Sequence, residues 1–130
     1  LSLDSTLHLF DGSQMTLCYN TIRDEQANNL MFIRVPKCSA PVILDDLFRR
    51  NIQSVLVEGG TNTFDDFINS GLWDEARVFV SSTSFGEGVN APSLDLSKAE
   101  AENVGSDQLF TLRNLGVQNF STKAPPVPVK

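Results

Sequence analysis

The stretch Ser54-Val55-Leu56-Val57-Glu58-Gly59-Gly60-Thr61-Asn62-Thr63-Phe64 carries the clearest structural pattern of this chain. An apolar run ends at a carboxylate and two glycines, and a helical pattern begins directly after them. This order predicts a strand over residues 53–57, a tight turn, and a helix over residues 61–70. The first turn of a helix has unpaired backbone N–H groups and a partial positive charge. The turn therefore suits a ligand that carries phosphate.

The double glycine also has a simpler interpretation. Gly59 and Gly60 can serve only as a tight connection between strand and helix, with Asn62 or Thr63 as the helix cap. Glu58 can likewise do no more than accept local N–H bonds. The sequence contains neither the GxGxxG fingerprint nor the GxxxxGK[ST] loop, so no phosphate-binding motif decides between the two interpretations.

Composition limits the class of protein. A chain of 130 residues with 41% hydrophobic and 20% charged residues supports one ordinary globular domain. A net charge of −6 with scattered basic residues argues against a nucleic-acid partner. No apolar run is long enough to span a bilayer, and no secretory signal pattern is present, so we expect no membrane partner.

The cysteines and the histidine predict no metal site. Cys18 and Cys38 stand far apart without a CxxC motif, and His8 is the single histidine. We therefore expect free thiols and a reducing, cytoplasmic location. No residue is predicted to be a catalytic nucleophile, acid or base, because no histidine is placed by a motif to activate the hydroxyls of residues 81–84.

The remaining elements follow from apolar runs and turn signals. We expect strands over residues 15–19, 30–35, 75–82, 98–104 and 108–113, and a helix that Ser39 caps and that ends near Asn51. The order predicts an α/β fold with a mostly parallel sheet flanked by helices and an antiparallel hairpin at its C-terminal edge. The apolar run 78–80 is typical of a strand covered on both faces. We assign residues 1–115 to the domain and residues 116–130 to an extended, proline-rich tail.

Several segments resemble one known family. They are Val55-Leu56-Val57-Glu58-Gly59-Gly60, Phe67-Ile68, Gly71-Leu72-Trp73-Asp74-Glu75, Phe79-Val80, Gly86, Val104-Gly105-Ser106-Asp107 and Leu1-Ser2-Leu3-Asp4-Ser5. Together they resemble the C-terminal reductase domain of the RibD riboflavin biosynthesis proteins. The resemblance implies the dihydrofolate-reductase-like fold and an NADPH-dependent oxidoreductase. In that family, the ribosylamino group of 5-amino-6-(5-phosphoribosylamino)uracil is reduced.

The resemblance also implies roles for single residues. Glu58 would contact the ribosyl part of the substrate, a phosphoribosylamino-pyrimidine. Asn20 and Thr21 would lie by the adenosine of NADPH. The loop around the cofactor's diphosphate would consist of Gly59, Gly60, Thr61, Asn62, Thr63 and Phe64, with Asp65 and Asp66 at its margin and pointing away from the ligand. The fold allows a cis peptide between the two glycines, and its members form homo-oligomers.

The chain departs from the family pattern in two places. Ser81-Ser82-Thr83 stands where the family has an apolar residue and a proline. The family's "SLDG" segment and the "HxE…PCxxC" signature of the zinc deaminase in the multifunctional members are absent from this sequence. We therefore expect the C-terminal half of a reductase domain, inactive by itself. Two alternatives stay open: a related reductase of another substrate, and a non-catalytic assembly module.

Overall fold

A computed structural model describes residues 6–84 and 86–117 of the chain. The chain falls into two compact units, Leu1–Leu56 and Val57–Lys130. The segment Leu1 to Ser5, which carries part of the family resemblance, and most of the proline-rich tail lie outside the described residues. In the described part of the chain, no helix is long and apolar enough to cross a membrane.

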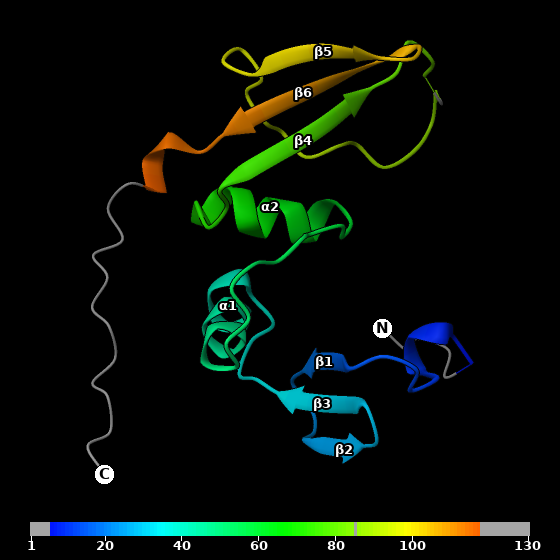
Figure 1. Cartoon of the computed structure of the whole chain (residues 1–130), viewed down its shortest axis with the longest axis vertical. Helices are drawn as coiled ribbons and strands as arrows, with labels where there is room; N and C mark the ends of the chain where they lie inside the picture. Colours follow the sequence, from blue (N-terminus) through cyan, green and yellow to red (C-terminus); the bar gives the residue numbers. More distant parts are fainter. Residues whose placement is uncertain (1–5, 85, 118–130) are drawn as a thin grey trace. The chain divides into compact units, whose positions relative to one another are not determined.

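The first unit is built on a three-stranded sheet (Figure 1). A short 3-10 helix, η1 (His8–Phe10), precedes the strands β1 (Thr16–Asn20), β2 (Glu25–Ala27) and β3 (Leu30–Arg34), and the helix α1 (Ala40–Arg49) follows them. The sheet order is β1-β3-β2. β1 runs parallel to β3, with Asn20 opposite Arg34, whereas β2 is antiparallel to β3. The buried apolar residues of this unit are Ile33, Val35 and Ala40.

β2 lies between the two strands predicted over residues 15–19 and 30–35, in a segment for which the sequence predicted no strand. Its residues Glu25, Gln26 and Ala27 are all exposed and show no apolar alternation, so periodicity could not reveal them. The turn to β3 contains Asn28 at a φ of 52°. Asparagine tolerates this left-handed conformation, which lets the short hairpin close.

α1 confirms the predicted helix with two corrections. Ser39 occupies the N-cap position with an extended backbone, but its side chain makes no capping hydrogen bond. The helix starts instead with a proline in its first turn, where a missing N–H costs nothing. The helical spacing of Ile43, Leu44, Leu47 and Phe48 predicts one apolar face, but Phe48 is 66% exposed.

The strand predicted over residues 53–57 does not form. Residues 52–60 have no regular secondary structure. Within the described residues no strand pairs with this segment, and Leu56 is 83% exposed. A β-strand is stabilised by pairing and packing with neighbouring strands more than by its intrinsic propensity. An apolar run without a pairing strand therefore stays irregular.

The second unit begins with α2 (Thr61–Ser70), which has the predicted bounds. Gly71 follows the helix at a φ of 67°, and the N–H group of Leu72 donates to the carbonyl of Phe67 at 3.2 Å. These are the features of a glycine-terminated helix end. The strands β4 (Glu75–Val80), β5 (Glu100–Val104) and β6 (Asp107–Arg113) and the 3-10 helix η2 (Leu115–Val117) complete the unit.

The sheet of the second unit corrects the expected topology. Its order is β4-β6-β5, and both pairs are antiparallel (Figure 1). Among the described residues, only β1 and β3 are parallel, so the expected mostly parallel sheet is not formed. The predicted hairpin at the C-terminal edge is present and turns at Gly105, which has a φ of 64°. β4 is not covered on both faces, because Phe79 is 62% exposed.

Candidate functional site

The N-terminus of α2 carries the unpaired amides that the sequence predicted. Gly60 is the N-cap residue, with an extended backbone and no side chain to cap the helix. Its carbonyl accepts hydrogen bonds from the amides of Thr63 at 2.9 Å and Phe64 at 3.2 Å. The amides of Thr61 and Asn62 have no acceptor within residues 6–84 and 86–117. Two N–H donors are thus available to a ligand, and the interpretation of Asn62 or Thr63 as the cap is wrong.

The turn has glycine at positions 59 and 60 for two different physical reasons. A Cβ atom on Gly59 would lie 2.7 Å from Cβ of Thr63, closer than real Cβ contacts. Gly59 is therefore explained by the close approach of the Thr63 side chain. A Cβ on Gly60 would meet nothing within 4 Å, so the main chain at Gly60 is open. The described residues contain no cis peptide bond, so the peptide between the two glycines, which the resemblance allowed to be cis, is trans.

The side chains around the turn are only partly available to a ligand. The hydroxyl of Thr61 donates to the carbonyl oxygen of Asn90 at 2.8 Å, so a neighbouring loop already uses it. Glu58 is exposed, and its carboxylate has no hydrogen-bond or ion-pair partner in the part of the chain that the structure describes. Asp65 and Asp66 are half-buried.

Asn20, predicted to lie by the cofactor's adenosine, has a structural role in the turn after β1. Its Oδ1 accepts hydrogen bonds from the amides of Ile22 at 2.9 Å and Arg23 at 2.7 Å. Its Nδ2 donates to the carbonyls of Cys18, Arg23 and Ile33 at 3.2, 3.0 and 3.3 Å. The side-chain amide is therefore fully used inside the protein. Thr21 is exposed.

Two arginines at the end of the parallel strands were not predicted as site residues. Arg34 is opposite Asn20 in the register of β1 and β3, and the guanidinium of Arg23 lies 4.2 Å from the centroid of the Phe32 ring. Glu25 pairs with Nη1 of Arg23 at 3.0 Å. The carboxyl ends of parallel strands are where α/β proteins bind ligands. The sequence signal that could have found these arginines is the position of each at or just after the end of a strand.

Comparison with known families now decides the class of this chain. The family model described as RibD C-terminal domain matches residues 1–123. The chain belongs to the RibD C-terminal domain family. A search of the curated proteins finds no match. The family is that of the reductase domain of riboflavin biosynthesis, and the matched residues include both the turn after β1 and the double glycine before α2.

The first unit of this RibD C-terminal domain also contains a polar cluster that joins β1 to α1. The hydroxyl of Tyr19 donates to Oδ2 of Asp46 at 2.7 Å, and Nε of Arg50 donates to the same oxygen at 2.6 Å. Burial, with the adjacent Asp46 carboxylate, raises the pKa of Tyr19 to about 12. The hydrogen bonds from Arg50 and Tyr19 hold the pKa of Asp46 below its usual value. No group of three metal-ligating side chains occurs among the described residues.

Proposed function

We propose that this chain is part of an NADPH-dependent reductase that acts on 5-amino-6-(5-phosphoribosylamino)uracil in riboflavin biosynthesis. The observation that carries the proposal is the family match over residues 1–123. The unpaired amides at the start of α2 give independent support, because they suit the diphosphate of a dinucleotide. We further propose that the enzyme is longer than this chain, cytoplasmic and homo-oligomeric, and that the chain alone is inactive.

In this proposal the main chain of the second unit holds the cofactor. The amides of Thr61 and Asn62 donate to diphosphate oxygens, and the open backbone at Gly60 lets the diphosphate approach. The Thr61 hydroxyl contributes only if it leaves the carbonyl of Asn90. NADPH, when bound, supplies the hydride. The protein residues bind and orient the two reactants.

Two further groups of residues would set specificity. The exposed carboxylate of Glu58 accepts hydrogen bonds from ribosyl hydroxyls of the substrate and so orients the group that is reduced. Thr21 is proposed to lie by the adenosine. Arg23 and Arg34 supply positive charge at the strand ends of a chain with a net charge of −6. Such charge favours the additional phosphate of NADPH over NADH.

The test uses the full-length enzyme and a single substitution. Glu58→Gln keeps the shape of the side chain and removes its charge. We expect kcat/KM to fall about 100-fold, with an unchanged circular dichroism spectrum, when NADPH oxidation is followed by absorbance. The matched control, Glu102→Gln on the exposed strand β5, should keep full activity.

The same experiment separates the alternatives. An assembly module would oxidise no NADPH, and Glu58→Gln would then change nothing. A reductase of another substrate would oxidise no NADPH with the phosphoribosylamino-pyrimidine but would do so once its own hydride acceptor is supplied, and its gene would not restore growth to a riboflavin auxotroph. Restored growth by the wild-type gene, with loss of rescue by Glu58→Gln, is the result that we expect.

A further inference from the structure

A loop of the second unit is attached to the start of α2 by one side-chain hydrogen bond. The hydroxyl of Thr61, the first residue of α2, donates to the carbonyl oxygen of Asn90 at 2.8 Å. Asn90 belongs to the connection between β4 and β5, and residues 86–91 of this connection form a strap. Within residues 6–84 and 86–117, no other hydrogen bond joins the strap to a residue outside the connection.

The strap has few contacts besides this bond. All of its residues are exposed, and Val89 has the largest exposure of its large apolar side chains, at 89%. A Cβ atom on Gly88 would meet no atom within 4 Å, so the space around the strap is open. In the rest of the connection, every second residue from Pro92 to Leu96 is half-buried. Because segments with few buried contacts open first, the position of the strap depends on the bond to α2.

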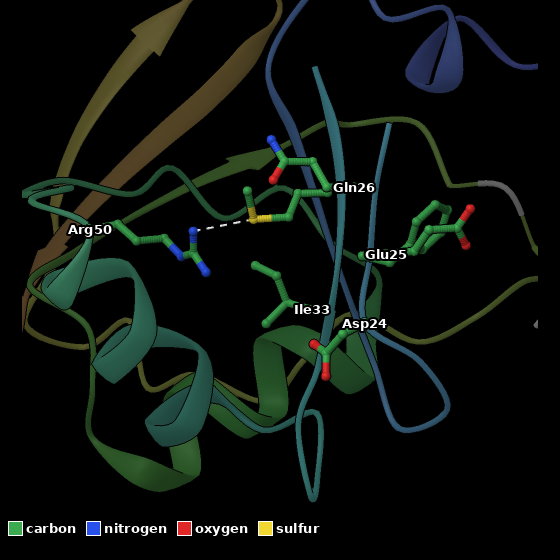
Figure 2. Close-up of a pocket in the computed structure, with 7 residues that line it drawn as sticks. Asp24, Glu25, Gln26, Ile33 and Arg50 are labelled. Carbon is green, nitrogen blue, oxygen red and sulfur yellow. Dashed lines mark hydrogen bonds between the residues drawn. The ribbon is translucent and has the colours of Figure 1, made fainter. Parts of the chain in front are cut away.

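A connection in the first unit shows the contrast. Figure 2 shows Arg50, which directly follows α1, extending toward β3, where its Nη1 donates to Sδ of Met31 at 3.3 Å. Nε of the same guanidinium donates to Oδ2 of Asp46 at 2.6 Å, and the guanidinium also contacts Tyr19. Loss of one of these bonds leaves the others in place. Loss of the bond from Thr61 leaves the strap without a hydrogen bond to the helix.

The oxygen that the strap presents conflicts with an anion at the start of α2. The carbonyl oxygen of Asn90 lies 2.8 Å from the hydroxyl oxygen of Thr61, carries partial negative charge and has no hydrogen to donate. It therefore repels a phosphate oxygen that approaches the unpaired amides of Thr61 and Asn62. The phosphate is also the better acceptor for the hydroxyl, because hydrogen bonds to ionised groups are about twice as strong as those between neutral groups.

We propose that the Thr61 hydroxyl holds the strap against α2 in the free protein, and that a bound diphosphate releases it. The hydroxyl turns from the carbonyl of Asn90 to a phosphate oxygen, and the strap loses its attachment. This release rests on the proposed function, because the diphosphate of NADPH is the ligand that displaces the strap. Cofactor binding then includes the cost of breaking one hydrogen bond, and the cofactor shifts the strap from the attached to the free state.

Proteolysis of the strap measures its release without relying on enzyme activity. Glu87 is exposed within the strap, so a glutamate-specific protease can cut after it once the segment is free to enter the protease. The rate of this cut is followed by mass spectrometry in the full-length enzyme, free and with saturating NADPH. We expect NADPH to raise the rate about fivefold, the factor that corresponds to one hydrogen bond.

Three substitutions test the attachment in the free enzyme. Thr61→Val keeps the shape of the side chain and removes the hydroxyl, so the cut after Glu87 should be about fivefold faster without NADPH, and NADPH should add no further increase. Thr61→Ser keeps the hydroxyl and should behave as the wild type. The matched control is Thr83→Val, because the Thr83 hydroxyl makes no hydrogen bond within the described residues. This control should leave the rate unchanged.

The outcomes separate this inference from the proposed function. If isothermal titration calorimetry shows NADPH binding, but the cut after Glu87 is unchanged or slower, the strap inference is wrong and the proposed cofactor stands. Absence of NADPH binding would reject the proposed function, and the release with it. Equal rates for the wild type and Thr61→Val would show that the hydroxyl does not hold the strap. If Thr61→Val fails to fold, the effect of NADPH on the wild type decides the question.

Discussion

The turn after β1 and the turn before α2 were both predicted to contact the cofactor, and they differ in where their polar groups point. In the first turn, the Asn20 side chain makes five hydrogen bonds, all to the protein's own backbone. In the second turn, the amides of Thr61 and Asn62 have no acceptor within the described residues. A polar side chain at a strand end is thus not evidence of a ligand, whereas unpaired backbone donors leave binding capacity.

This comparison also separates the two glycines within the second turn. The Thr63 side chain packs closely against Gly59, whereas Gly60 borders open space. One glycine therefore serves the fold and the other is free to serve a ligand. Four predictions test the contrast between groups that serve the fold and groups that are left for a ligand.

The largest effect is expected at Gly59. Gly59→Ala places a Cβ 2.7 Å from Cβ of the stiff, β-branched Thr63, so the backbone or the helix start must shift. We expect the free energy of unfolding to fall by about 2 kcal/mol, as for overpacked core sites. Urea denaturation followed by circular dichroism measures it. The double variant Gly59→Ala with Thr63→Gly removes the opposing side chain and should recover part of the loss. No loss in the single variant would refute the packing explanation.

The next largest effect is expected at Asn20, because its side chain has a structural role. Asn20→Ala removes all five hydrogen bonds and leaves the amides of Ile22 and Arg23 without their acceptor. We expect a loss of about 1–2 kcal/mol in the free energy of unfolding. The neighbouring exposed Thr21→Ala should change it by less than about 0.5 kcal/mol. If Asn20→Ala instead weakens NADPH binding without loss of stability, the side chain serves the cofactor, and the contrast between the two turns fails.

Gly60→Ala should weaken cofactor binding and have little effect on stability, in contrast to Gly59→Ala and Asn20→Ala. A Cβ at this position meets no protein atom within 4 Å, so the fold should lose less than about 0.7 kcal/mol. In the full-length enzyme the same methyl group obstructs the approach of the diphosphate to the amides of α2. We expect the Kd for NADPH to rise about tenfold, equal to about 1.4 kcal/mol, in isothermal titration calorimetry. An unchanged Kd would mean that the diphosphate binds elsewhere.

Local signals in the sequence sufficed for the helix after the second turn, but not for the irregular segment before it or for the hydrogen bonds of Asn20. The start of α2 at Thr61 and its end before Gly71 follow from a helical apolar pattern and a glycine terminator, which act over a few residues. The irregular state of residues 52–60 depends on the absence of a pairing strand among the described residues. The role of Asn20 depends on the carbonyl of Ile33, a residue of another strand. Such contacts are set by tertiary structure, which periodicity does not encode.

The smallest effect concerns the hydrogen bond from the Tyr19 hydroxyl to Asp46, which connects β1, and with it the turn at Asn20, to α1. Tyr19 is the single tyrosine of the chain, so its ionisation can be followed by ultraviolet absorbance without interference from another phenol. We expect a midpoint near its pKa of about 12, above the ordinary value of about 10. Asp46→Asn should lower the midpoint but not to 10, since burial, the larger cause, remains. Asp45→Asn, which does not contact Tyr19, should leave it unchanged.

The sign of the effect on stability follows from the same pKa. Because the folded chain holds the Tyr19 proton more tightly than the unfolded chain, this contribution is complete below pH 10 and is lost as the pH rises toward about 12. Urea midpoints of the wild type should therefore fall more steeply between pH 10 and 12 than those of Tyr19→Phe. Parallel curves would show that folding does not raise the pKa of Tyr19, which would contradict both the burial of the phenol and its hydrogen bond to Asp46.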